Sequence, residues 1–449
     1  MDSGTEIDIH DELAGAAVTP LHKMLGVVIT LITLFDGYDT FNPAYVIHYV
    51  MQPWGLLPSQ AGLLVSSGLV GFLFGAMGHG MIADRYGRRN TLLAGLWIVN
   101  VLTLLTALFA TSFVSFCGLR FLTGLGLGVL LPLGTTYINE LAPQRVSNSF
   151  SLWGVTLGWS FGGVAAGLVG VYLTPSYGWQ ILYFVGALSI PLTLVVHAVL
   201  PESPKFLAAH GRLVELRALM ARLRPEQSGI YANATFRTSD RMPKNTIAAL
   251  LAPRYRRVSL TIWLTAFLTL FAIFGLVGWI PTVMIKRGES FASGFSYGAL
   301  MQATSFIGGL ALATLADRGF AATPRLLGLW WVIGGLAVGA LVFVNGHVFN
   351  FTVVAVAGFC VIGAQHVLNN FTANSYETGF RASGVGMELG VGRIGGILGP
   401  YVIGLLQQVT GGPEPVFWAI SGAAIVAALV IGSLAIRPQT AQIGVAPAE

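Results

Sequence analysis

Two aspartates lie three residues apart in the first long apolar stretch of the chain. Asp36 and Asp39 belong to the sequence FDGYDTFNP at 35–43, and this spacing places both on one face of a helix. Gly37 and Pro43 can loosen the backbone between two half-helices there. Two carboxylates close together in a low-dielectric site cannot both ionise easily, so the pattern predicts a proton-coupling site. The alternative is an interfacial pair that caps a short helix.

Two arginines also lie inside apolar stretches, where a charged side chain costs about 2.5–3.5 kcal/mol on insertion scales. Arg393 is flanked by glycines, and a permanently charged, bidentate guanidinium in a polar cavity suits a carboxylate ligand. Its alternative partners are Glu388 and the two aspartates of the first stretch. Arg120 is interpreted either as a structural counter-ion or as part of the pathway for proton and ligand.

Aromatic and polar side chains in other apolar stretches complete the candidate site. The rings of Tyr38 and Trp279 can stack on an aromatic ligand. The segment QHVLNN at 365–370 places polar side chains one helical turn apart, and His366 can titrate near pH 7 or can serve as a hydrogen-bonded packing residue. The candidate ligand-binding residues are therefore Tyr38, Arg120, Trp279, His366, Asn369 and Arg393.

These candidate residues are predicted to lie on membrane-spanning helices. Of the 449 residues 54% are apolar and 10% are charged, against about 25% charged in an average soluble domain, so a solvated surface is excluded. The first apolar run follows an acidic segment and is too long for a cleaved signal, so it is expected to stay as a helix. Twelve runs reach spanning length, at 23–50, 59–82, 90–110, 113–139, 148–173, 179–200, 258–285, 293–316, 324–345, 348–374, 384–408 and 416–437.

The positive charges orient these spans. The outer loops hold only Lys286 and Arg287, whereas the inner loops and the central segment 201–257 collect the other loop cations, so both termini are predicted to be cytoplasmic. The basic central segment is explained by this rule better than by nucleic-acid binding. The predicted division is a tail at 1–22, a six-helix bundle at 23–200, a cytoplasmic loop at 201–257, a second six-helix bundle at 258–437 and a tail at 438–449.

The two halves read as repeats. Asp84-Arg85 after the second span corresponds to Asp317-Arg318 after the eighth. Glu140 with Arg145 corresponds to Glu377 with Arg381. At a nearly constant offset, three glycines of the fifth span also correspond to three of the eleventh: Gly158, Gly162 and Gly167 to Gly395, Gly399 and Gly404. Two pseudo-symmetric six-helix halves are a transporter architecture, with the substrate site between them near the bilayer midplane.

The segment GMIADRYGRR at 80–89 resembles the G-x-x-x-D-R-x-G-R-[RK] signature of the major facilitator superfamily, and RFLTGLGLG at 120–128 is similar to its R-x-x-x-G-x-G motif. The resemblance implies the major facilitator fold, all-α with twelve transmembrane helices. It also implies a charged latch at the cytoplasmic gate that holds the outward-open state. The gate residues would be Asp84, Arg85, Arg88, Arg89, Glu140, Arg145, Asp317, Arg318, Glu377 and Arg381.

Further segments resemble the aromatic acid:proton symporter family within that superfamily. They are DGYD at 36–39, PESPK at 201–205, GWIPT at 278–282 and the glycine-rich stretch 381–400 around Arg393. The resemblance implies proton-coupled uptake of a small aromatic carboxylate, such as a benzoate or hydroxybenzoate, across a bacterial inner membrane.

Other functions fit the sequence less well. The same fold could carry another solute, such as a sugar, an aliphatic organic acid or an exported drug. A sensor would need an appended signalling domain. An enzyme would need a nucleophile or metal cluster, and no H-E-x-x-H, G-x-S-x-G or Walker sequence occurs. We therefore expect a monomeric, non-enzymatic transporter in the lipid bilayer, with no cofactor, no metal and no nucleic-acid partner.

Overall fold

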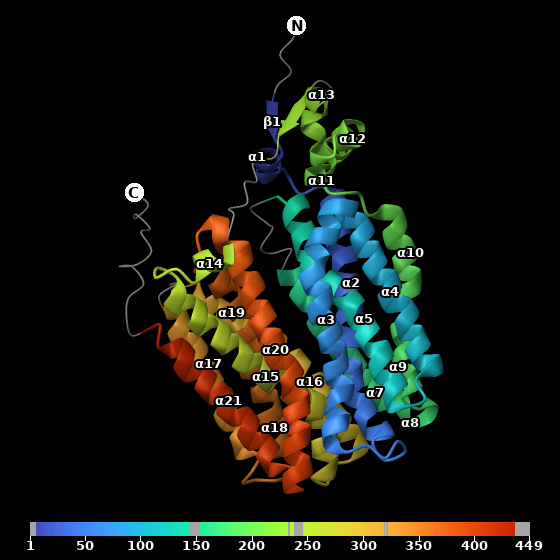
Figure 1. Cartoon of the computed structure of the whole chain (residues 1–449), viewed down its shortest axis with the longest axis vertical. Coiled ribbons are helices and arrows are strands. Elements are labelled where there is room, and N and C mark those ends of the chain that lie inside the picture. Colours follow the sequence, from blue (N-terminus) through green and yellow to red (C-terminus); the bar gives the residue numbers. More distant parts are fainter. Residues whose placement is uncertain are drawn as a thin grey trace.

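Long helices dominate the structure, a computed structural model that describes residues 6–143, 152–231, 234–237, 246–317, 319 and 322–435. They form two groups that lie side by side, one from each half of the chain (Figure 1). Eleven helices in the described part are long and apolar enough to cross a membrane. The chain is an integral, multi-pass membrane protein.

The first group contains six spans. Two of them are composite, because a π-helical turn precedes α7 and a break separates α9 from α10. The elements are α2 (Pro20–Val50), α3 (Pro58–Tyr86), α4 (Arg88–Phe109), α5 (Phe113–Leu141), η1 (Leu152–Leu157), α7 (Gly158–Tyr172), the short α8 (Thr174–Tyr177), α9 (Gln180–Gly186) and α10 (Ser189–Val199).

The second group has the same plan. Its elements are α14 (Thr246–Leu250), α15 (Arg256–Lys286), α16 (Phe291–Ala316), α17 (Thr323–Ala340), α18 (His347–Ala357), η4 (Gly358–Ile362), α19 (Gly363–Asn374), α20 (Thr378–Thr410) and α21 (Glu414–Gly432). Helix α17 is absent from the eleven apolar spans because its 18 residues begin with the polar turn Thr-Pro-Arg. It stands where the span 324–345 is predicted and packs against α21, which completes the twelve-helix fold.

Local sequence signals begin and end these helices. Proline occupies the first helical position of α2 and α3, where its missing N–H costs nothing. The Ser112 hydroxyl accepts a hydrogen bond from the Ser115 amide at 3.3 Å and so caps α5. Gly87 has φ of 99°, a conformation that favours glycine, and it makes the sharp turn from α3 into α4.

The repeated glycines serve the same packing contact in both groups. A Cβ atom on Gly158 of α7 would lie 2.2 Å from Thr33 Oγ1 on α2. A Cβ atom on Gly395 of α20 would lie 2.0 Å from the Phe267 carbonyl oxygen on α15. Both helix pairs therefore approach too closely for any side chain at these positions, and the repeat in the sequence is a repeat in the fold.

A small cap covers one end of the first group (Figure 1). Its two strands, β1 (Glu6–Asp8) and β2 (Thr235–Arg237), pair in parallel, with Ile7 opposite Phe236. Arg224 forms an ion pair of 2.8 Å with Glu12. No sequence pattern predicts this cap, whose residues are expected to form a cytoplasmic tail and a cytoplasmic loop. We define the cap as β1 (Glu6–Asp8), α1 (Ile9–Ala14), α11 (Pro204–Ala209), α12 (Leu213–Leu223), η2 (Pro225–Gln227), α13 (Ser228–Tyr231) and β2 (Thr235–Arg237).

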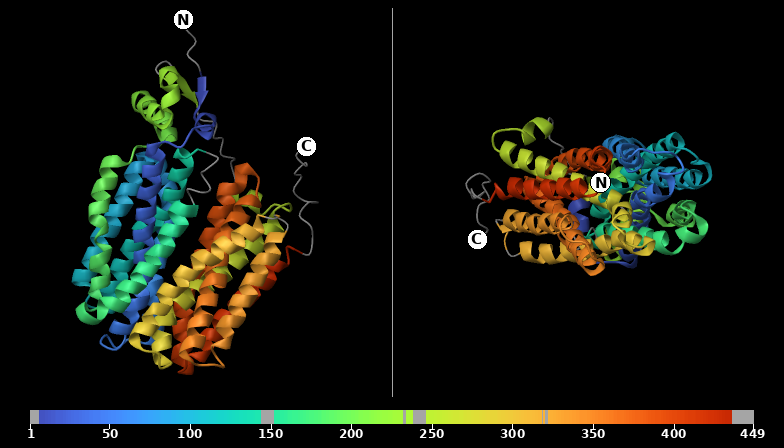
Figure 2. Two further views of the ribbon diagram at one scale, coloured as in Figure 1. Left: turned by 180° about the vertical axis from the view of Figure 1, so that it is seen from behind. Right: turned by 90° about the horizontal axis from the view of Figure 1, so that it is seen from below.

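The two groups meet away from the cap and diverge toward it (Figure 2). At the far end the Ser66 hydroxyl of α3 donates to the Ile397 carbonyl oxygen of α20 at 2.6 Å, and Ser59 donates to Gln408 at 2.7 Å. The halves are therefore in contact at the far end, and their helices diverge toward the cap.

Candidate functional site

The arginine within α5 is paired with an aspartate of α2. Arg120 Nη1 lies 2.7 Å from Asp39 Oδ2, and Nη2 donates to the Asp39 carbonyl oxygen at 2.9 Å. Thr103 of α4 donates to the other carboxylate oxygen at 3.3 Å. Both charged residues are buried, with 1% and 2% of their surfaces exposed. Of the two interpretations of Arg120, this geometry favours the counter-ion, since the guanidinium already holds a carboxylate.

Asp36 lies one helical turn before Asp39 in different surroundings. Its surface is 1% exposed, and neither carboxylate oxygen has a hydrogen-bond partner. The charged groups that act on it electrostatically are Arg393 of the other half and Asp39. A buried carboxylate without donors is unfavourable in its ionised form, so Asp36 is the less restrained of the two aspartates.

Arg393 of α20 lies between two aromatic rings from different halves. Its guanidinium carbon is 3.8 Å from the ring centroid of Phe72 on α3 and 5.5 Å from that of Phe274 on α15. Its Nη1 atom is buried without a partner, and in the described part of the chain it has no ion pair with Glu388 or with either aspartate of α2. The structure thus presents a cation with a spare donor, flanked by two ring faces.

Phe72 and Phe274 are not among the residues predicted for the site. Phe72 belongs to α3 and Phe274 to α15, and no motif connects them with Arg393. Their proximity depends on how three helices pack, for which the sequence carries no signal.

A polar cluster surrounds Glu388 inside the second group. Gln365 of α19 donates to Glu388 Oε1 at 3.2 Å and accepts from Thr269 of α15 at 2.7 Å. With its amide oriented by these neighbours, Asn369 also donates to Glu388 Oε1 at 3.0 Å. Gln365 and Asn369 thus share a helix face, and that face binds a carboxyl group.

Three predicted ligand-binding residues lie in helix contacts instead. The Tyr38 hydroxyl donates to the Leu182 carbonyl oxygen at 2.9 Å, and the Trp279 indole donates to the Pro400 carbonyl oxygen at 2.8 Å. His366 packs against α16, where a Cβ atom on Gly309 would lie 3.1 Å from its ring. Their contact with a ligand stays a prediction, because in this conformation each has a packing role.

The predicted gate residues form separate networks in the two halves. Arg88 binds Asp84 at 2.9 Å and approaches Glu140 at 3.5 Å, while Arg89 donates to the Leu200 carbonyl oxygen at 2.7 Å. Glu202, absent from the predicted set, accepts from the Arg89 amide at 3.0 Å.

In the second half Glu377 forms an ion pair of 2.8 Å with Arg254. Arg254, like Glu202, is not among the predicted gate residues. Arg85 lies beside the Tyr86 ring, and Asp317 and Arg381 are exposed. Arg145 and Arg318 lie outside the described residues. Within the described ranges no ion pair joins the two halves.

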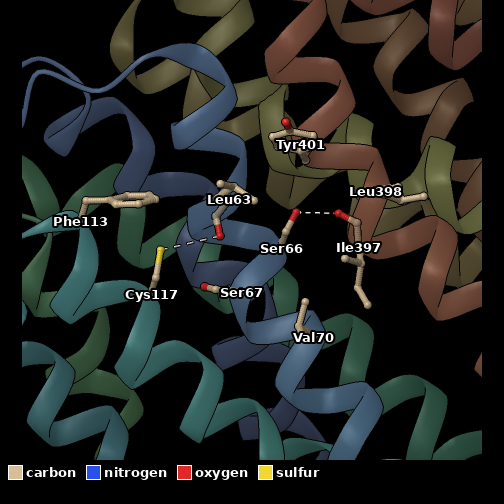
Figure 3. A pocket seen from close by; sticks show the side chains of 9 residues that line it. All are labelled: Leu63, Ser66, Ser67, Val70, Phe113, Cys117, Ile397, Leu398 and Tyr401. Atoms are coloured by element: carbon tan, nitrogen blue, oxygen red, sulfur yellow. Dashed lines mark hydrogen bonds between the residues drawn. The ribbon is translucent and has the colours of Figure 1, made fainter.

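An apolar cavity of about 270 Å³ lies elsewhere, where α3, α5 and α20 meet (Figure 3). Ser66 and Ile397 line it from the two halves, and Cys117 lines it from α5. None of the buried charged residues is among its lining residues. We therefore do not assign this cavity to the charged site.

Buried arginines and carboxylates within two pseudo-symmetric groups of spans indicate the class of protein, a membrane transporter. The chain belongs to the Major Facilitator Superfamily, whose model matches residues 27–387. It is thus a transporter and not an enzyme.

Relatives with stated substrates cover nearly the whole chain. It is 31% identical over 404 residues to a 4-hydroxybenzoate transporter, PcaK, of Pseudomonas aeruginosa, which covers 88% of each chain. It is 33% identical over 433 residues to a gallate transporter of Pseudomonas putida, covering 95% of this chain and 94% of the relative. A niacin transporter of Acinetobacter baylyi, NiaP, is 31% identical, covering 95% and 96%.

Solved structures agree with the fold. The xylose transporter XylE of E. coli, in a partially occluded inward-open conformation, superposes with a TM-score of 0.75 at 16% identity. The match covers 92% of this chain and 97% of that structure. At this identity the likeness shows the major facilitator fold alone.

Proposed function

We propose that the protein takes up a small aromatic carboxylate together with protons, by alternating access across a bacterial inner membrane. The relatives that support this transport 4-hydroxybenzoate, gallate and niacin, and the transporter of benzoate from Acinetobacter baylyi is 28% identical. A single chain forms the transport unit.

The observation that carries the proposal is the position of Arg393. Its guanidinium offers an unpartnered donor for a carboxylate, and the rings of Phe72 and Phe274 beside it offer apolar faces to an aromatic ring. Since Phe72 belongs to the first half and Arg393 to the second, a ligand bound here touches both halves. Such a ligand is placed to influence how the halves move against each other.

Proton coupling would arise from the electrostatic interaction between Asp36 and the Arg393 guanidinium. An ionised Asp36 and a substrate carboxylate would compete for the same cation. The substrate therefore binds more tightly when Asp36 carries a proton, and by thermodynamic reciprocity bound substrate favours the protonated form. Asp39, held by Arg120, supports this site by fixing the fold of α2 next to it.

The cap end faces the cytoplasm in this proposal. The central segment is rich in Lys and Arg, as the positive-inside rule requires. The divergence of the halves at this end then corresponds to an inward-facing state, in which the Asp84–Arg88–Glu140 network lies within one half. The predicted latch across the gate, including Arg145, Arg318 and Arg381, would engage only in the outward-facing state.

Uptake into proteoliposomes tests the proposal. Labelled benzoate, 4-hydroxybenzoate, gallate, niacin, an aliphatic acid and glucose would be offered with and without an inward proton gradient, with protein-free liposomes as the control. We expect gradient-driven accumulation of the aromatic acids only. Accumulation that does not depend on the proton gradient would contradict proton symport. Transport of glucose at the same rate as the aromatic acids would contradict the proposed substrate class.

A further inference from the structure

Glu388 is a buried carboxyl group that the proposed transport cycle does not yet use. It lies in α20, none of its surface is exposed, and its Oε2 atom has no hydrogen-bond partner. Its other oxygen accepts from the amides of Gln365 and Asn369. The group is thus held on one side by neutral donors and left unsatisfied on the other.

The contrast with Asp39 indicates the state of this carboxyl group. Asp39 is equally buried, but Arg120 compensates its charge at 2.7 Å. Glu388 has no cation within 4 Å in the described part of the chain, although Arg393 is five residues further along the same helix with its guanidinium over Phe72. A buried carboxylate that lacks both a cation and a full set of donors is strongly disfavoured, whereas the protonated acid can remain there.

The helices around Glu388 offer hydrogen-bonding groups but no opposing charge. Helix α15 presents Thr269, which donates to Gln365, and α19 presents the two amides. The Glu388 carboxyl group acts electrostatically on the Tyr376 phenol, which is itself hydrogen-bonded to the Ser259 hydroxyl at 2.9 Å. Neutral groups of this kind bind the protonated acid and provide no ion pair that would hold it permanently as a carboxylate.

We infer that Glu388 is a second proton-carrying residue, so that two protons accompany each substrate anion. The inference rests on the proposed proton-coupled uptake and adds the stoichiometry. In each cycle the Glu388 carboxylate gains a proton from the outer side to form an O–H bond, and that bond breaks when the proton passes to water at the cap end. With one proton on Asp36 and one on Glu388, a monovalent anion enters with a net charge of plus one.

The charge balance makes the inference measurable on the wild-type protein. In proteoliposomes with 4-hydroxybenzoate as the probe, the substrate ratio at zero net flux is measured under imposed pH gradients and membrane potentials. Two protons shift that ratio about 100-fold per pH unit, against about 10-fold for one proton. Two protons also make it respond to the potential, by about 50-fold per 100 mV, whereas one proton leaves it insensitive.

The substitution Glu388→Gln assigns the second proton to this residue. In this variant we expect the substrate ratio at zero net flux to change about 10-fold per pH unit and not to respond to the membrane potential, because the amide resembles the protonated acid. The matched control is Glu414→Gln, an exposed carboxyl group of the same half, which should keep the wild-type values. If Glu388→Gln shows no net flux, substrate exchange is measured: retained exchange supports a block in proton release, and lost exchange contradicts the inference.

Other outcomes separate this inference from the function beneath it. A wild-type ratio that follows one proton, or a Glu388→Gln variant that follows two, overturns the role of Glu388 and leaves symport intact. A wild-type ratio that ignores the pH gradient overturns proton coupling itself.

Discussion

Asp39 binds Arg120 through both its carboxylate and its backbone carbonyl, at 2.7 Å and 2.9 Å. The pair joins α2 to α5 in the interior of the first half. Because removing one partner of a buried pair leaves an uncompensated charge, Arg120→Leu should destabilise the protein by about 3–5 kcal/mol. The double variant Arg120→Leu/Asp39→Asn should recover part of this loss. Thermal unfolding in detergent measures both, and a single variant as stable as the wild type would contradict the pairing.

Asp36 and Asp39 should differ in their response to an amide substitution. With Asp36→Asn one of the two proposed proton-carrying groups is permanently neutral, so we expect substrate exchange to continue while the dependence of accumulation on the pH gradient falls from about 100-fold to about 10-fold per pH unit. Asp39→Asn should abolish uphill uptake through damage to the site. The measurement is uptake and exchange in proteoliposomes after insertion is verified. If both variants keep the pH-dependent accumulation of the wild type, the coupling role is wrong.

Arg393→Lys should weaken substrate binding while the positive charge is kept. A lysine cannot offer the bidentate fork or stack on Phe72. Loss of a hydrogen bond to a charged group costs about 1.5–3 kcal/mol, so the half-saturating concentration should rise roughly 10-fold to 150-fold. The control is Arg212→Lys, an exposed arginine of the cap. An unchanged half-saturating concentration would contradict the proposed role of Arg393 in substrate binding.

The far-end contact between the halves can be locked covalently. Ser59 and Gln408 approach each other across this contact, with their side-chain oxygens 2.7 Å apart, so cysteines at both positions should be joined by a short, reducible bis-thiol crosslinker. We expect uptake to stop and to return on reduction, in a background without Cys117 and Cys360. The single-cysteine variants are the controls. A crosslinked protein that still transports would show that the halves need not separate at this end.

Glu289, in the turn between α15 and α16, should make stability depend on pH. Burial pushes the pKa of this carboxyl group up, but hydrogen bonds from Asn350, His347 and Tyr297 outweigh burial and hold its pKa below the ordinary value. Its stabilising contribution is therefore present above about pH 4.3 and is lost as the pH falls through the lower folded-state pKa. Melting temperatures measured across this range should fall more steeply for the wild type than for Glu289→Gln. Parallel curves would refute the assignment.

Much of the fold could be predicted because membrane-spanning helices can be identified from long apolar runs in the sequence. The predicted span 113–139 corresponds to α5 (Phe113–Leu141) and the span 293–316 to α16 (Phe291–Ala316). The span 324–345 is longer than α17, whose helix ends at Ala340. The cap was not predictable in the same way, since its short helices and its strand pair are held by contacts between distant segments, such as Arg224 with Glu12.

The candidate site, too, was predictable only in part. Asp36, Asp39, Arg120 and Arg393 can be recognised in the sequence as charged residues within the membrane, because their surroundings are apolar. Their partners are visible only in the packed helices: Arg120 compensates Asp39, whereas Arg393 lies against Phe72 and Phe274. Membrane insertion depends on each segment's own composition, whereas charge compensation depends on distances of a few ångströms between helices that are remote in the chain.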